Sequence, residues 1–227
     1  MRNQKEINER MRAILVDWLI EVHLKFKLRE DTLFLTINLM DRYLEKREVA
    51  KGELQLVGAT AMFVACKFEE IHPPELQDFV YVTDKAYTNS DFIRMEEMML
   101  KTLNYAVIVV TPNTLLRRLH QLDQKCNKMT YFLSSYFIEL ALIEYRMIKY
   151  RPSLQAAAAL YLARKTCKLV PAWDEFFEKY TTYSEDSIRP CAKDICALLH
   201  GIEKSRLQAV KTKYSSTERM EVAKVKF

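Results

Sequence analysis

Apolar residues recur along most of the chain at the three- and four-residue spacing of an α-helix. The stretches DTLFLTINLMDRYLEK at 31–46 and TYFLSSYFIELALIEY at 130–145 show the pattern clearly. The 227 residues include only three glycines, whereas a sheet protein with many tight turns needs more of them. The pattern therefore predicts an all-α protein.

The first strongly apolar stretch is MRAILVDWLIEV at 11–22, in which nine of twelve residues are apolar. A surface helix needs an apolar stripe only somewhat wider than about 100°, and here the apolar arc covers about twice that angle. We therefore expect one part of this arc to pack inside the protein and the rest to serve another purpose.

The sequence repeats when it is shifted by 98 residues. Residues 32–44 then align with 130–142, and 61–67 align with 159–165; the matches include Pro73 with Pro171, Phe79 with Phe177 and Lys67 with Lys165. Shared helical periodicity alone explains the apolar matches but not the lysine and proline pairs. We predict two tandem repeats of similar fold, at 1–108 and 109–227, joined near 107–113.

Each repeat contains one helix that is apolar or small on nearly every side, at 54–67 and at 154–165. Small residues at Gly58, Ala59, Ala61 and Ala65, and at 156–159, allow close helix contact, so each should be a central helix wrapped by about four others. Prolines are expected at helix starts or in linkers, at Pro73, Pro74, Pro112, Pro152, Pro171 and Pro190.

Composition narrows the possible classes of protein. The formal charge of +5 comes from 35 basic and 30 acidic residues of interspersed sign, too weak a bias to predict a nucleic-acid partner. Five cysteines without Cys-x-x-Cys spacing indicate free thiols in a reducing compartment. The charged N-terminus is no secretory signal, and no apolar run is long enough to span a membrane.

Known catalytic patterns are missing from the sequence. It has no Glu-x-x-His pair, no glycine-rich phosphate loop and no His-Glu-x-x-His, and no serine or cysteine stands beside a base in a known motif. The acidic segment WDEFFE at 173–178 lacks twin-aspartate spacing and is interpreted as a solvated helix start. We expect a non-enzyme that uses no metal and no cofactor.

Long motifs resemble the cyclin family over almost the whole chain. They are MRAILVDWLIEV at 11–22, KFEEIHPPELQDFVYVTDKAYT at 67–88, RMEEMMLKTLNY at 94–105 and YRPSLQAAAALYLARK at 150–165. The segment VHLKFKLREDTLFLTINLMDRYL and the tail KYSS look more like B-type than A-type mitotic cyclins. The resemblance implies two tandem five-helix cyclin folds with short flanking segments.

The resemblance also implies a function in cell division, as the regulatory subunit that binds and activates a cyclin-dependent serine/threonine kinase in the nucleus and cytoplasm. In cyclins the first fold holds the mobile αC helix of the kinase through a lysine and a glutamate, which match Lys67 and Glu96 here. Phe68, Leu100 and Tyr105 would add apolar contact, although Tyr105 replaces the phenylalanine that is often found there. Without the resemblance, Lys67 and Glu96 would be ordinary solvated helix charges.

Two further roles follow from the resemblance. Arg12 and Asp41 match a pair that ties the first helix to the second. A substrate-docking patch that captures Arg-x-Leu segments of substrates or inhibitors would comprise Met11, Ile14, Leu15, Trp18, Glu21, Leu54 and Gln55. The alternative is that these apolar side chains belong to the core.

Two other functions remain open at the level of sequence. Transcription factors with tandem cyclin-like folds bind DNA but should carry a concentrated basic face, and a helical scaffold without a kinase partner is the second alternative. Mitotic cyclins also carry an N-terminal extension with an Arg-x-x-Leu degradation signal, which this sequence lacks, so we expect a truncated or short form.

Overall fold

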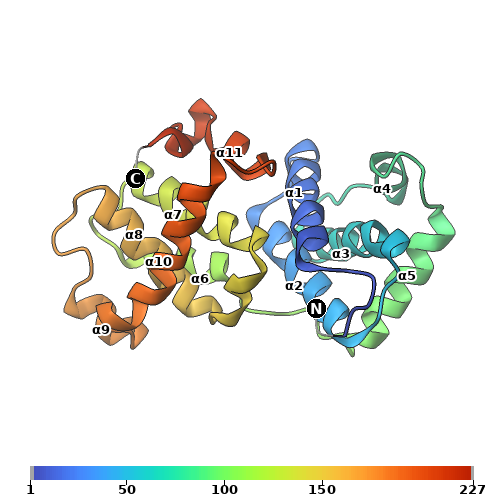
Figure 1. Cartoon of the computed structure of the whole chain (residues 1–227), viewed down its shortest axis with the longest axis horizontal. Helices are drawn as coiled ribbons and strands as arrows, with labels where there is room; N and C mark the ends of the chain where they lie inside the picture. Colours follow the sequence, from blue (N-terminus) through green and yellow to red (C-terminus); the bar gives the residue numbers. More distant parts are fainter. Residues whose placement is uncertain (1–2, 226–227) are drawn as a thin grey trace. The chain divides into compact units, whose positions relative to one another are not determined.

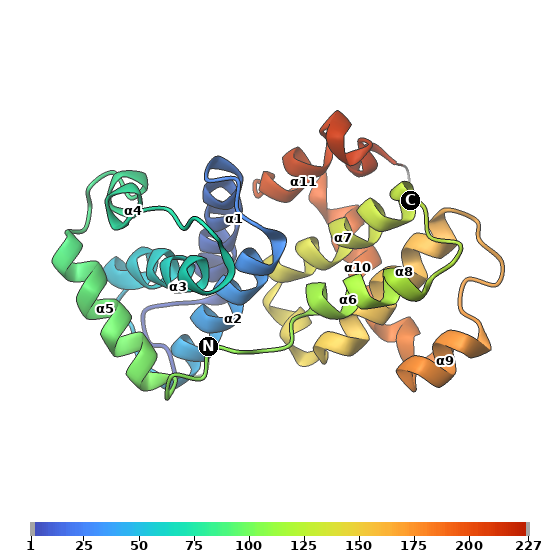
Figure 2. The ribbon, with the colours of Figure 1, turned by 180° about the vertical axis from the view of Figure 1, so that it is seen from behind.

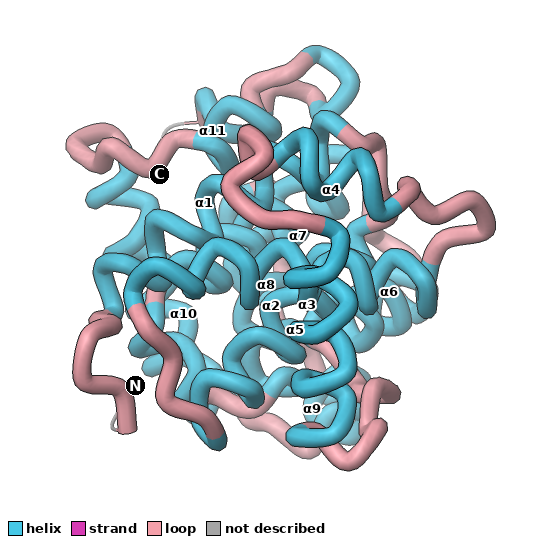
Figure 3. Tube along the Cα trace, turned by 90° about the vertical axis from the view of Figure 1, so that its right-hand side faces the viewer, coloured by secondary structure: helices cyan, strands magenta, loops and turns pink. Residues whose placement is uncertain are grey.

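Helix α3 (Leu54–Glu69) is the centre of the first of two units, which comprises residues 1–111. It contacts α1 (Glu9–Lys25), α2 (Glu30–Lys46), α4 (Leu76–Val82) and α5 (Asn89–Thr102), and the short 3-10 helix η1 (Lys51–Glu53) leads into it (Figure 1). The computed structural model describes residues 3–225, and within that range it contains helices and loops but no strand (Figure 3). The all-α prediction is confirmed.

Local sequence explains where the helices of this unit begin. The side chain of Asn8 accepts a hydrogen bond of 3.0 Å from the Met11 backbone N–H and caps α1. Thr88 and Asp91 form a reciprocal capping box at the start of α5. Each device satisfies a backbone N–H that has no partner inside its own helix.

Gly58 allows α1 and α3 to approach closely. A Cβ atom at this position would lie 2.9 Å from both methyl carbons of Leu15, which is closer than ordinary van der Waals contact. The expected role of small residues in the central helix therefore has a direct geometric basis in this unit.

The second unit, residues 112–227, is built around α8 (Pro152–Thr166). Helix α8 packs against α6 (Pro112–Leu122), α7 (Lys128–Ile143) and α10 (Glu185–Ile202), which Figure 2 shows from the reverse side. Helix α9 (Glu175–Thr181) contacts α8 through Arg164, whose guanidinium lies 4.9 Å from the ring centroid of Phe177. The short helix η2 (Tyr145–Lys149) connects α7 to α8.

The segment after α10 is anchored to α7 by a buried ion pair. It consists of α11 (Ala209–Tyr214), η3 (Thr217–Arg219) and η4 (Val222–Lys224). Lys213 donates hydrogen bonds of 2.7 and 2.8 Å to the Glu139 carboxylate, and the Tyr214 hydroxyl donates another of 2.6 Å. All three side chains are buried, so this network fixes the final helix to the unit.

The two units confirm the predicted repeat in their packing. Phe79 of α4 and Phe177 of α9 match in the 98-residue shift, and both are buried. One detail of the sequence prediction is wrong, because Pro190 lies inside α10 rather than at a helix start or in a linker. Pro190 is solvent-exposed and lies in the second turn of α10, so its missing N–H removes one intrahelical hydrogen bond, the one to the carbonyl of Asp186.

Candidate functional site

Lys67 and Glu96 form an ion pair that joins the last turn of α3 to α5. The Lys67 side chain is 42% exposed and that of Glu96 is 17% exposed, so the pair lies at the surface and remains accessible to a partner. The Lys67 ammonium also lies 4.1 Å from the ring centroid of Phe63, and a cation is favoured at the C-terminal end of a helix. The pair is therefore held in place before any partner binds.

Apolar side chains are exposed in the segments that carry this pair. Phe68 is 50% exposed and Tyr105 is 65% exposed, while Leu100 is partly buried. Sequence reasoning did not select two further exposed residues, Ile71 and Ile93. The spacing of Ile93 to Glu96 and Leu100 on α5 is the i, i+3, i+7 pattern of one helix face, and this was the signal that could have identified it.

Arg12 and Asp41 join α1 to α2. The guanidinium donates two hydrogen bonds, of 2.6 Å from Nε and 2.7 Å from Nη2, to the two oxygens of the Asp41 carboxylate. The Arg12 side chain is 1% exposed and that of Asp41 is 22% exposed. A two-pronged contact of this kind fixes the relative orientation of the helices as well as satisfying the buried charge.

The residues expected to form the substrate-docking patch divide between core and surface. Leu15 and Leu54 are each only 6% exposed, whereas Ile14 is 51% exposed and Glu21 is also exposed. Met11, Trp18 and Gln55 lie between these extremes. The apolar surface that a partner could reach is therefore smaller than a patch made of all seven residues would be. Ile14 is the most exposed of its apolar side chains.

Burial makes three of the cysteine thiols poor nucleophiles. It raises the pKa of Cys66 and of Cys191 to about 12, and that of Cys126 to about 11. These thiols stay protonated at neutral pH, whereas the thiolate is the reactive form. Within residues 3–225 no three His, Cys, Asp or Glu side chains gather in a metal-binding arrangement, and no helix there is long and apolar enough to cross a membrane.

Comparison with known families identifies the fold that carries this surface. The model of the cyclin N-terminal domain matches residues 1–108, and that of the cyclin C-terminal domain matches residues 110–227. The chain belongs to the cyclin family.

Curated relatives over nearly the whole chain include mitotic cyclins of the B type, as the sequence motifs predicted. The chain is 44% identical to G2/mitotic-specific cyclin-B of Dictyostelium discoideum, over 99% of this chain and 52% of that protein. It is 42% identical to G2/mitotic-specific cyclin S13-7 of Glycine max, over 97% of this chain and 86% of that protein. The chain spans about half the length of several of the curated relatives that it matches, G2/mitotic-specific cyclin-B among them.

Solved structures share the tandem fold at low sequence identity. A viral cyclin from herpesvirus saimiri has a TM-score of 0.77 at 21% identity, with 87% of each chain covered. A chain of the CAK complex of Chaetomium thermophilum bound to ATP-gamma-S has a TM-score of 0.64 at 15% identity, over 96% of this chain and 72% of that chain. These likenesses, with the family models, confirm two tandem cyclin folds.

Proposed function

We propose that this chain is the regulatory subunit of a cyclin-dependent kinase and that it binds the kinase through the first unit. The contact surface would comprise Lys67, Phe68, Glu96, Leu100 and Tyr105. Membership of the cyclin family supports the proposal, and the observation that carries it is the exposed Lys67–Glu96 pair beside exposed aromatic side chains.

The chemistry of the pair allows it to bind a kinase backbone without breaking. An ammonium group has three donors and a carboxylate has about four acceptor positions, so one mutual contact leaves capacity on both sides. Lys67 can therefore donate to a backbone carbonyl while Glu96 accepts from a backbone N–H. Their mutual contact reduces the conformational entropy that each side chain loses on binding.

The mechanism of activation is a population shift. Phosphoryl transfer by a protein kinase requires the glutamate of helix αC to pair with the ATP-binding lysine. A partner that binds only the active position of αC stabilises that position, and a change from 1:99 to 99:1 requires about 5.5 kcal/mol of differential binding. The cyclin then contributes no catalytic atom, which agrees with its family of non-catalytic subunits.

The deciding experiment is co-purification with candidate kinases followed by a phosphorylation assay. Charge-assisted hydrogen bonds contribute about 1.5 to 3 kcal/mol each, so Lys67→Ala with Glu96→Ala should weaken kinase binding about a hundredfold or more. Lys165→Ala is the matched control, because it removes the lysine that corresponds to Lys67 in the second unit. A double variant that activates the kinase as well as the parent does would refute the assignment.

We also propose that the substrate-docking patch captures Arg-x-Leu segments of substrates or inhibitors. Ile14, Met11 and Trp18 would contact the leucine, and the exposed Glu21 carboxylate would pair with the arginine. Burial of one leucine is worth about 1.5 to 3 kcal/mol, which is enough for reversible docking.

The burial of Leu54 determines how docking should be tested. Leu54→Ala would create a cavity as well as alter the surface, so Ile14→Ala with Gln55→Ala is the cleaner variant. It should slow phosphorylation of an Arg-x-Leu substrate and leave a short peptide without that motif unaffected. Ile148→Ala in η2, a similarly exposed isoleucine, serves as the control. Equal loss on both substrates would mean that the patch contacts the kinase instead.

The proposed role places the protein in the nucleus and cytoplasm, with the kinase and its substrates as partners and without nucleic acid or membrane. A DNA-binding transcription factor is the competing function, and a scaffold without a kinase is another. Binding to duplex DNA that falls steeply with salt would favour the first, whereas failure to capture any cyclin-dependent kinase would favour the second.

A further inference from the structure

Two partly exposed cysteines, Cys126 and Cys167, lie at one end of the second unit. Cys126 is in the loop between α6 and α7, and Cys167 caps the C-terminal end of α8. The Thr130 hydroxyl lies 3.5 Å from the Cys167 sulfur and 3.1 Å from Oδ1 of Asn127, the residue that follows Cys126. Both thiols, which are free in the structure, are therefore close to the first turn of α7.

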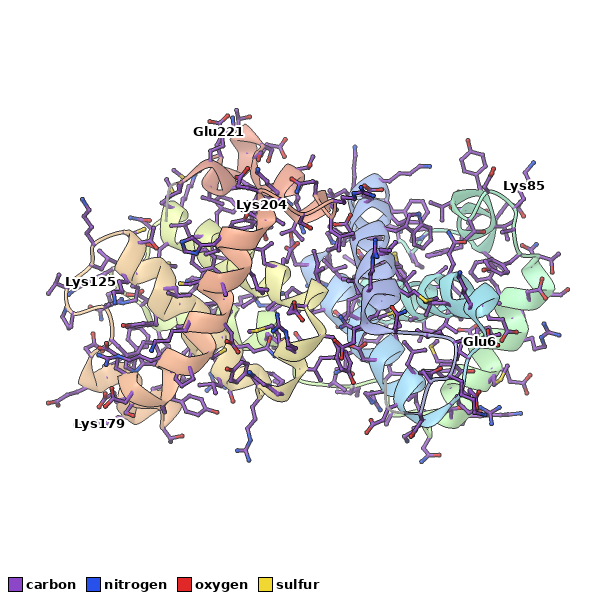
Figure 4. The ribbon with its side chains drawn as sticks, in the orientation of Figure 1. Glu6, Lys85, Lys125, Lys179, Lys204 and Glu221 are labelled. Atoms are coloured by element: carbon purple, nitrogen blue, oxygen red, sulfur yellow. The ribbon has the colours of Figure 1, made fainter. Side chains whose placement is uncertain are left out.

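Further contacts hold the loop before α7 against the loop after α8. The Lys125 ammonium donates a hydrogen bond of 3.4 Å to the Val170 carbonyl, and Figure 4 labels this lysine. The buried Arg164 pairs with Asp123 at the start of the first loop and donates to two backbone carbonyls of the second loop. The two segments that carry the thiols are thus fastened to each other at the surface of the unit.

The internal repeat places the same two loop positions together in the first unit. In the 98-residue shift Cys126 corresponds to Leu28, and Cys167 corresponds to Glu69. There Arg29, the neighbour of Leu28, donates a hydrogen bond of 3.1 Å from Nη1 to the carbonyl of Glu69. The fold therefore brings these positions into proximity in both units, and only the second unit has a thiol at each of them.

The imidazole of His120 supplies a proton acceptor beside the Cys126 sulfur. Its Nδ1 lies 3.1 Å from this sulfur, and its Nε2 lies 2.8 Å from the Ser134 hydroxyl. That hydroxyl donates its own proton to the Thr130 carbonyl, at 2.8 Å, so its oxygen accepts from the Nε2–H of His120. This tautomer leaves the lone pair of Nδ1 for the Cys126 thiol, and an adjacent base of this kind activates a nucleophile.

We propose that Cys126 and Cys167 form a reversible disulfide when the protein meets hydrogen peroxide, and that His120 accepts the proton of Cys126. Disulfides inside reducing compartments are usually transient or redox-sensing, which fits two cysteines that are free in the structure. The new bond joins the loop before α7 to the end of α8, so oxidation restricts the motion of the second unit at this end.

Cys167 reacts with the peroxide first. Burial and Asp123 raise the pKa of Cys126 to about 11, with a smaller contribution from Cys167 and against the effect of Arg164, so Cys126 keeps its proton at neutral pH. The Cys167 sulfur bonds to one peroxide oxygen as the O–O bond breaks, and the products are a sulfenic acid and one water.

In the second step the Cys126 sulfur attacks the Cys167 sulfur. The Cys126 proton passes to Nδ1 of His120, and hydroxide leaves the sulfenic acid and takes that proton to become a second water. Together the two thiols lose two electrons and two protons, and one peroxide molecule is reduced to two waters. A thiol reductant reverses the bond by exchange.

The test is peptide mapping of the full chain by mass spectrometry, after reduction, exposure to a small excess of hydrogen peroxide and alkylation of the remaining thiols. We expect one crosslinked peptide that joins residues 126 and 167. It should disappear on treatment with dithiothreitol and be absent from Cys126→Ser and from Cys167→Ser. Cys196→Ser is the matched control and should still form the crosslink, because Cys196 is another partly exposed thiol of this unit, in α10.

Trapping of the sulfenic acid with dimedone shows the order of the two thiols. Cys126→Ser should accumulate the label at Cys167, whereas Cys167→Ser should show little label at Cys126. His120→Gln should slow formation of the crosslink about tenfold or more, and it should leave the rate of labelling at Cys167 unchanged in the Cys126→Ser background. Ser134→Ala, which releases the tautomer, should slow the same step by a smaller factor.

A thermal melt of each variant shows that it is folded before its reactivity is compared. The disulfide would be refuted if peroxide yields no crosslinked peptide, if the crosslink joins two molecules, or if Cys196→Ser abolishes it. An unchanged rate of crosslink formation in folded His120→Gln and Ser134→Ala would overturn the role of the imidazole.

Discussion

The two units share one fold but differ at the position that defines the candidate kinase contact. Helix α5 begins after its cap Thr88 and α10 begins after its cap Ser184, so Glu96 of the first unit corresponds to Ala192 of the second. The same alignment of α5 with α10 places buried residues at corresponding positions, because Met95 matches Cys191 and Met99 matches Ile195. The corresponding lysines therefore have different surroundings.

Lys67 pairs with Glu96, whereas the Lys165 ammonium lies 3.4 Å from the hydroxyl of Tyr161 on its own helix. Each lysine lies in the last turn of its central helix, where a positive charge is favoured, so the shared fold explains why both positions carry a lysine. It does not explain the ion pair between Lys67 and Glu96. The comparison teaches that corresponding surface positions of a repeated scaffold can differ in their ion pairs while the buried positions of both copies stay apolar.

Buried ionic groups are the second difference between the units. The first unit has the Arg12–Asp41 pair, in which the carboxylate is partly exposed to solvent. In the second unit, Arg164 and Asp123 are 1% and 2% exposed, and Arg164 also donates to the carbonyls of Pro171 and Ala172. This network ties α8 to the loops on either side, whereas the Arg12–Asp41 pair joins two helices.

The largest effect should come from breaking the buried pair of the second unit. Asp123→Ala leaves the buried Arg164 charge with only the more distant Asp174 carboxylate, 3.8 Å away, and loss of one partner of a buried pair costs about 3 to 5 kcal/mol. Asp41→Ala should cost less, about 2 to 3 kcal/mol, because water reaches the remaining charge more easily. Chemical denaturation of the full chain measures both values. Equal and small losses would show that the buried ion pairs do not distinguish the units.

A second, intermediate effect is a dependence of stability on pH through His120. Burial lowers the pKa of His120 to about 4, against a weaker opposing effect of Asp123. Its ring nitrogens lie 3.1 Å from the Cys126 sulfur and 2.8 Å from the Ser134 hydroxyl, and the Tyr131 ring is 5.0 Å away. The folded state therefore keeps the imidazole neutral.

The sign follows from the lowered pKa. Above pH 6.5 the histidine is neutral in both states and contributes its full stability, and this contribution is lost as pH falls toward 4, because the unfolded chain then binds the proton. The loss is about 1.4 kcal/mol per pH unit, or about 2 kcal/mol between pH 6.5 and 5. The loss of stability should be seen as faster hydrogen exchange of the α6 and α7 backbone amides at the lower pH. His120→Gln should flatten the dependence, and an unchanged slope in that variant would assign it to other groups.

The smallest effect concerns the central helices. Gly58 of α3 corresponds to Ala156 of α8, and a Cβ atom added at Gly58 would lie 2.9 Å from both methyl carbons of Leu15. Gly58→Ala gains helix propensity but forces the Leu15 methyl groups to move, for a net cost of about 1 kcal/mol. Ala156→Gly should cost about 1 kcal/mol for the opposite reason, because it lowers helix propensity. A Gly58→Ala protein more stable than the parent would show that Leu15 relocates freely.

The sequence by itself determined the helical class, the twofold repeat and the small-residue helices at the centre of each unit. These properties depend on spacing within short segments, which local periodicity records. The repeat also identified Lys67 and Lys165 as corresponding positions, although it could not show that Lys67 pairs with Glu96 while Lys165 lies beside the Tyr161 hydroxyl.

Only the tertiary structure decided which apolar residues are inside and which charges meet. Ile14 and Leu15 are neighbours in one apolar stretch, yet Leu15 packs against Gly58 while Ile14 stays exposed, because a helix turns about 100° per residue and the position of α3 selects the buried side. Lys67 and Glu96 are 29 residues apart, and only the packing of α5 on α3 brings them together. Local pattern fixes the faces of each helix, whereas contacts between distant segments determine which face becomes a surface for a partner.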